Sequence, residues 1–97
     1  MDEIAWTEPA LQNLDDIGDY IALDNPRAAE NVVRRIVETV AALAYHPRMG
    51  RAGLVAPTRE LIVSGTPYIV VYRLRERIEI IAIFHGARKW PSSFDHP

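Results

Sequence analysis

Residues 59–84, RELIVSGTPYIVVYRLRERIEIIAIF, decide the fold of this chain. They contain three runs rich in β-branched and aromatic residues, RELIV, YIVVYRL and RIEIIAIF, separated by the short connections SGTP and RE, the latter extended to RER if Arg77 joins the turn. Such runs predict β-strands, and the short connections predict antiparallel neighbours. The last two runs are apolar at nearly every position, which is typical of strands covered on both faces for part of their length.

Charge pairing sets the expected register of the last two strands. If the turn between them holds three residues, Arg73 faces Glu79 across the sheet. The other pairs in this register are apolar, Val71 with Ile81 and Ile69 with Ile83. Provided that no bulge intervenes, His85 then shares a sheet face with Arg73 and Glu79.

The first half of the chain predicts a short strand, EIAW, followed by two helices. Thr7 can N-cap the first helix, and Asn25 can N-cap the second with Pro26 at its first position. Apolar residues recur at helical spacing in both helices, and we expect Val33, Ile36 and Val40 to face the sheet. The short link between the helices predicts an antiparallel hairpin.

The element order is therefore β-α-α-β-β-β, an α+β fold with an antiparallel sheet packed against an N-terminal helix hairpin. A length of 97 residues predicts one domain, residues 1–97. Residues 47–58, PRMGRAGLVAPT, are expected to form a loop, and they include two arginines and no acidic residue.

Composition narrows the expected location of the protein. The chain has no cysteine, which favours a reducing, cytoplasmic location over secretion. The acidic start MDEIAWTEPA does not resemble a signal peptide, and no apolar run approaches the roughly 20 residues of a membrane span.

Charge is distributed unevenly along the sequence. Residues 1–46 hold nine acidic and three basic residues, whereas residues 47–97 hold four acidic and eight basic ones. Ten of the eleven basic residues are arginines, whose planar guanidinium suits carboxylate or phosphate. The basic half could bind an anionic partner, or the two halves could neutralise each other within the fold.

Motifs for metal, cofactor or phosphate binding are not found. The three histidines, His46, His85 and His96, are too scattered to predict a metal site, and we expect neither a metal nor a cofactor. What remains is a basic, partly aromatic set of residues that could contact nucleic acid or an acidic protein segment. This set consists of Arg59, Arg73, Arg75, Arg77, His85, Arg88, Lys89 and Trp90.

Four segments resemble the RelE/ParE toxins of type II toxin–antitoxin systems. They are AWTEPALQNLDDIGDYIALDNPRAA, HPRMGR, RELIVSGTPYIVVYRL and IEIIAIFHGARKWP, and they cover almost the whole chain in the family's order. The resemblance implies the fold outlined above and a growth-inhibiting bacterial toxin. It also implies silencing by a cognate antitoxin protein whose tail wraps around the toxin.

The resemblance leaves two mechanisms open. RelE-like members cut messenger RNA on the ribosome without a metal, which in this chain would assign His85 as the base and Arg59, Arg73 or Arg88 as the cation. ParE-like members inhibit DNA gyrase and cut no RNA. The strand YIVVY has Ile69 where the nucleases carry a catalytic arginine, so the chain resembles ParE-like members more closely.

We therefore expect a ParE-like gyrase inhibitor that acts by binding rather than by catalysis. The expected contact residues for target or antitoxin are Arg59, Arg73, Arg75, Arg88, Lys89 and Trp90. A ribosome-dependent messenger RNA endonuclease is the alternative, and a non-toxic adaptor domain is a third possibility. Structural roles also stay open, because Arg73 could simply pair with Glu79, and Tyr68 and Tyr72 could belong to the core.

Overall fold

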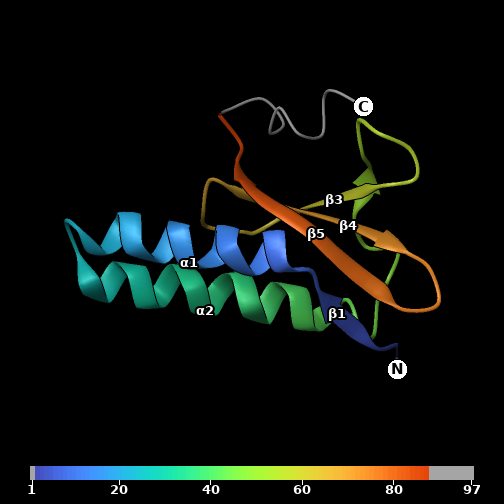
Figure 1. Ribbon diagram of the computed structural model, residues 1–97, viewed down its shortest axis with the longest axis horizontal. Coiled ribbons are helices and arrows are strands. Elements are labelled where there is room, and N and C mark those ends of the chain that lie inside the picture. Colours follow the sequence, from blue (N-terminus) through green and yellow to red (C-terminus); the bar gives the residue numbers. More distant parts are fainter. Residues whose placement is uncertain (1, 88–97) are drawn as a thin grey trace.

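The computed structural model describes residues 2–87, in which two helices cover one face of a twisted sheet (Figure 1). The elements are β1 (Ile4–Trp6), α1 (Glu8–Ala22), α2 (Pro26–Ala42), β2 (Arg51–Ala52), β3 (Arg59–Ile62), β4 (Tyr68–Leu74) and β5 (Ile78–His85). The predicted helix hairpin and three strands are confirmed. The short strand β2 lies within the segment that was expected to be only a loop.

Both helices begin where their capping residues predict. The Thr7 hydroxyl accepts a hydrogen bond from the backbone N–H of Ala10 at 3.3 Å, and the Asn25 side chain accepts one from Ala28 at 3.1 Å. Each cap satisfies a backbone donor that has no partner within the helix. The helices approach closely at Gly18, where an added Cβ would lie 3.2 Å from a methyl group of Val33.

The strands form a five-stranded sheet in the order β1-β5-β4-β3-β2. All neighbouring pairs are antiparallel except that β1 runs parallel to β5, which the expectation of an antiparallel sheet did not include. The N-terminal strand thereby pairs with the C-terminal strand of the described chain (Figure 1).

The main core lies between the helices and one face of the sheet. Its fully buried side chains include Ile36, Val40, Leu43, Val63, Val70, Tyr72, Ile78 and Ile80. Ile36 and Val40 face the sheet as expected, whereas Val33 packs toward Gly18 of α1 and is only partly buried. A smaller apolar cluster on the other sheet face contains Val71, Ala82 and Phe84, with Ile69 and Ile81 packed against it.

A β-bulge changes the predicted register of β4 and β5. Arg73 pairs with Glu79 as expected, but beyond that point Val71 pairs with Ala82 and Ile69 with Phe84. The expected pairs with Ile81 and Ile83 are therefore wrong. Ile81 is the extra residue of the bulge, and one extra residue moves every later side chain to the opposite face. His85 consequently pairs with Tyr68 and does not share a face with Arg73 and Glu79.

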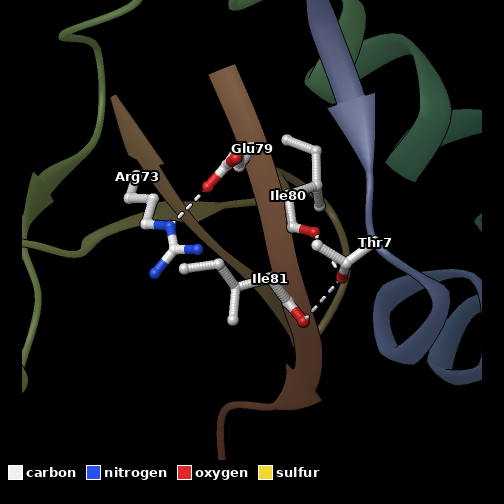
Figure 2. Close-up of polar contacts among 5 residues, drawn as sticks. All are labelled: Thr7, Arg73, Glu79, Ile80 and Ile81. Carbon is white, nitrogen blue, oxygen red and sulfur yellow. Dashed lines mark hydrogen bonds and ion pairs between the residues drawn. The ribbon is translucent and has the colours of Figure 1, made fainter. Parts of the chain in front are cut away.

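Polar side chains from the start of the chain contact β5 at this bulge. The Thr7 hydroxyl lies 2.7 Å from the carbonyl oxygen of Ile80 and 3.3 Å from that of Ile81 (Figure 2). The side-chain oxygen of Asn13 accepts a hydrogen bond from the backbone N–H of Ile83 at 3.0 Å. Because β1 ends at Trp6, Asn13 provides the acceptor that a longer parallel strand would otherwise offer.

Candidate functional site

Three arginines gather where β4 turns into β5. Arg73 and Glu79 form an ion pair with a nitrogen–oxygen distance of 2.5 Å (Figure 2), and Arg77 pairs with Glu3 of the N-terminal segment at 3.2 Å. Glu3, Arg75, Glu76, Arg77 and Glu79 line a polar surface hollow at this end of the sheet. Each positive charge thus has an acidic side chain nearby, so this surface is a mixed cluster rather than a purely basic patch.

The electrostatics of the cluster favour ionised Glu79. The hydrogen bond from Arg73 lowers the pKa of the Glu79 carboxyl, and the positive charges of Arg73, Arg75 and Arg77 act in the same direction. Desolvation opposes them and raises the pKa, but it is outweighed. Glu79 therefore compensates Arg73 at neutral pH, and Arg73 offers an anionic ligand little uncompensated charge.

Arg59 faces the opposite side of the sheet from Arg73, and its side chain binds backbone carbonyl groups. It pairs with Tyr72 across the sheet, and its guanidinium donates hydrogen bonds to the carbonyl oxygens of Gly50, at 2.7 Å, and Arg48, at 3.3 Å. Both bonds come from the same nitrogen, Nη1, and they fix the connection between α2 and β3. This placement supports a positioning role for Arg59 more than direct contact with a partner.

His85 lies at the far end of β5 from the arginine cluster. Its ring packs edge-on against Tyr68, with centroids 5.5 Å apart and an interplanar angle of 79°. The backbone N–H of Ala87 donates to His85 Nδ1 at 3.1 Å. Accepting this bond assigns the neutral ring the tautomer that carries its proton on Nε2.

The structure thus brings Arg73, Arg75 and Arg77 together, whereas Arg59 and His85 face the opposite side of the sheet from Arg73. His85 and Arg73 are near opposite ends of β5 and on opposite faces of the sheet. The remaining predicted contact residues, Arg88, Lys89 and Trp90, lie outside the described residues.

The main feature that no local sequence pattern predicts is the fixed shape of residues 47–58, which we call the anchored loop. Tyr72 is fully buried, and its hydroxyl accepts a hydrogen bond from Gly50 N–H at 2.8 Å and donates one to the Pro47 carbonyl at 2.9 Å. An added Cβ at Gly50 would lie 2.7 Å from that hydroxyl, so only glycine fits. The one available signal is general: a buried tyrosine hydroxyl needs a partner.

Residues 2–87 contain neither a candidate metal-binding group nor a helix that could span a membrane. Within that range, no group of three or more histidine, aspartate or glutamate side chains is placed to hold a metal ion. Neither of the two described helices combines the length and apolar character needed to cross a bilayer.

Comparison with known proteins gives a consistent family match. Residues 4–90 match the family described as "ParE toxin of type II toxin-antitoxin system, parDE". The "Putative toxin Y4kP" of Sinorhizobium fredii is 47% identical over 88 residues, which cover 91% of this chain and 92% of that protein. "Toxin RelE2" of Caulobacter vibrioides is 36% identical over 89 residues, covering 91% and 99%.

A solved structure shares the fold. The structure titled "Chromosomal ParDE TA system from P. aeruginosa" superposes with a TM-score of 0.79 at 31% sequence identity. The match covers 88% of this chain and 96% of that one. Two helices followed by a mostly antiparallel sheet are therefore common to both chains.

Proposed function

This chain belongs to the ParE toxin family of type II toxin–antitoxin systems, and from that premise we propose that it inhibits growth by binding DNA gyrase in the bacterial cytoplasm. A system of the ParDE type implies a cognate antitoxin, which we propose silences this toxin by binding it. The choice of gyrase as target rests on the closer resemblance of the strand YIVVYR to ParE-like members.

The separation of His85 from Arg73 is the observation that most supports binding over RNA cleavage. A nuclease needs a proton acceptor and a cation close to the same phosphodiester. Here the two side chains are on opposite sheet faces, and His85 Nδ1 is occupied by a backbone N–H. Ile69, at the position of the nucleases' arginine, packs in the smaller apolar cluster. An inhibitor that acts by binding needs none of these catalytic groups.

Parallel assays with two targets test this proposal. The purified chain would be added to a gyrase supercoiling reaction and to translating ribosomes, with the antitoxin complex as a matched control in each. With the free toxin we expect inhibited supercoiling and intact messenger RNA. With the complex we expect normal supercoiling and intact messenger RNA. Messenger cleavage on the ribosome with unaffected supercoiling would instead establish the RelE-like alternative. This alternative is tested because the Caulobacter relative is named "Toxin RelE2".

A further inference from the structure

The anchored loop presents apolar side chains to solvent. Among the described residues, nine large hydrophobic side chains are strongly exposed, and three of them, Met49, Leu54 and Val55, lie within these 12 positions. Leu54 is 75% exposed. Figure 1 shows this part of the chain extending from the β2–β3 edge of the sheet, away from the helix hairpin. Exposed apolar side chains such as Leu54 and Val55, adjacent in sequence, can form a protein contact.

Hydrogen bonds fix the shape of the exposed tip. Gly53 N–H donates to the carbonyl oxygen of Thr58 at 2.8 Å, and Thr58 N–H donates to that of Val55, also at 2.8 Å. The buried Thr58 hydroxyl also donates to the Val55 carbonyl. An added Cβ at Gly53 would clash with the Thr58 hydroxyl, so glycine is required there. Together with the Gly50 anchor, these bonds hold Leu54 and Val55 ready for binding and reduce the entropy lost on association.

Two arginines precede the tip in the anchored loop, and they give the loop its charge. Arg48 and Arg51 lie in the anchored loop, which contains no acidic residue. Arg51 pairs with the buried Glu60 at 3.1 Å but remains 64% exposed, and Arg48 is exposed with no ion pair inside residues 2–87. A complementary partner surface would offer apolar side chains next to carboxylates.

We propose that the anchored loop is a docking site for the antitoxin, whose bound segment places apolar side chains against Leu54 and Val55 and carboxylates near Arg48 and Arg51. The antitoxin fits better than the toxin's target because it stays bound while the toxin is silent, and permanent interfaces bury more apolar surface than transient ones. This inference rests on the proposed silencing by an antitoxin, but it does not depend on whether the target is gyrase.

Dissociation kinetics with the purified antitoxin encoded beside this chain's gene test the proposal. We would compare the wild-type chain with a Leu54→Ser, Val55→Ser double variant, because most effects of interface mutations appear in the dissociation rate. We expect the double variant to dissociate at least about tenfold faster, as when well-packed interface side chains are truncated. The matched control is Leu23→Ser, which alters an exposed leucine at the end of α1 and should change the rate by less than about twofold.

A second variant examines the charged part of the surface. Arg48→Glu should also accelerate dissociation, and its effect should shrink at high salt.

Unchanged far-ultraviolet circular dichroism and thermal midpoint would show that the variants fold. If the folded double variant dissociates at the wild-type rate but no longer inhibits growth, the loop contacts the target and the proposal is wrong. Failure of wild-type toxin to inhibit gyrase would overturn only the choice of target.

Discussion

The buried hydroxyl of Tyr72, on β4, lies 2.8 Å from the backbone nitrogen of Gly50, 22 positions earlier in the chain. It accepts the Gly50 N–H and donates to the carbonyl oxygen of Pro47, so one side chain from the core satisfies two backbone groups of the anchored loop. The shape of an exposed loop therefore depends on a residue that is not exposed at all.

Tyr72→Phe should test this anchor. The phenylalanine ring keeps the core filled but leaves the Gly50 N–H and the Pro47 carbonyl without the hydroxyl. We expect a loss of about 1–3 kcal/mol in the free energy of unfolding, the range for leaving buried polar groups unsatisfied. Urea denaturation measures it. Tyr20→Phe, which removes a hydroxyl from an exposed tyrosine, is the matched control and should be near neutral.

Ile36→Ala should identify the buried face of α2. Ile36 is fully buried among core residues beneath the sheet, so its truncation should cost about 2–5 kcal/mol of unfolding free energy. Asp16→Ala, on the exposed surface of α1, removes one hydrogen bond with Gln12 and should change stability by less than about 1 kcal/mol. If chemical denaturation ranked the two variants in the opposite order, the assignment of helix faces would be incorrect.

Glu79 should make stability depend on acid pH. Its pKa is lowered in the folded protein, chiefly by the hydrogen bond from Arg73, so folding favours the ionised form. That contribution is complete above the ordinary glutamate pKa and is lost as the pH falls through the lower, folded-state value. The urea midpoint of the wild type should therefore exceed that of Glu79→Gln by a larger margin at neutral pH than near pH 3. An equal difference at both pH values would contradict this account.

His85→Gln should separate binding from catalysis. Glutamine is similar in size and polar, but it cannot act as a general base, a role that contributes about 10²–10⁴-fold in enzymes that need it. For a gyrase inhibitor we expect only a modest change in growth inhibition and in supercoiling. Loss of a ribosome-dependent cleavage activity in this variant would show that the nuclease assignment of His85 is correct.

Target binding should weaken when Arg88, Lys89 and Trp90 are replaced. In sequence, these three positions combine an aromatic side chain with two cations. Arginine and tryptophan are the residues that most often dominate interface energies. A chain with alanine at all three positions should inhibit supercoiling only at higher concentration, with unfolding stability as the control. Undiminished inhibition by this variant would exclude these residues from the contact.

Local features of this fold could be predicted from the sequence, and distant ones could not. Thr7 and Asn25 cap their helices as expected, because a cap depends on residues three positions away. The Arg73–Glu79 pair was also predictable, because it lies beside the turn that sets the register. Beyond it, the bulge at Ile81 shifts the pairing, and no strand pattern shows where an extra residue is inserted.

The positions of the predicted contact residues could be anticipated in part for the same reason. Arg73, Arg75 and Arg77 are close in sequence and are close in space. Arg59 looked equivalent to them, yet its guanidinium binds the carbonyl oxygens of Gly50 and Arg48. Such a contact depends on how a distant loop folds back, which composition and periodicity do not specify.

The parallel pairing of β1 with β5 has a consequence for synthesis of the toxin. Thr7 and its partner Ile80 are 73 positions apart, so β1 cannot find its place in the sheet until most of the chain has left the ribosome. The helix hairpin can form early, but closing so long a segment is entropically costly and slow. During translation, the nascent protein therefore lacks a finished sheet, and an antitoxin already present in the cell could meet the toxin as it folds.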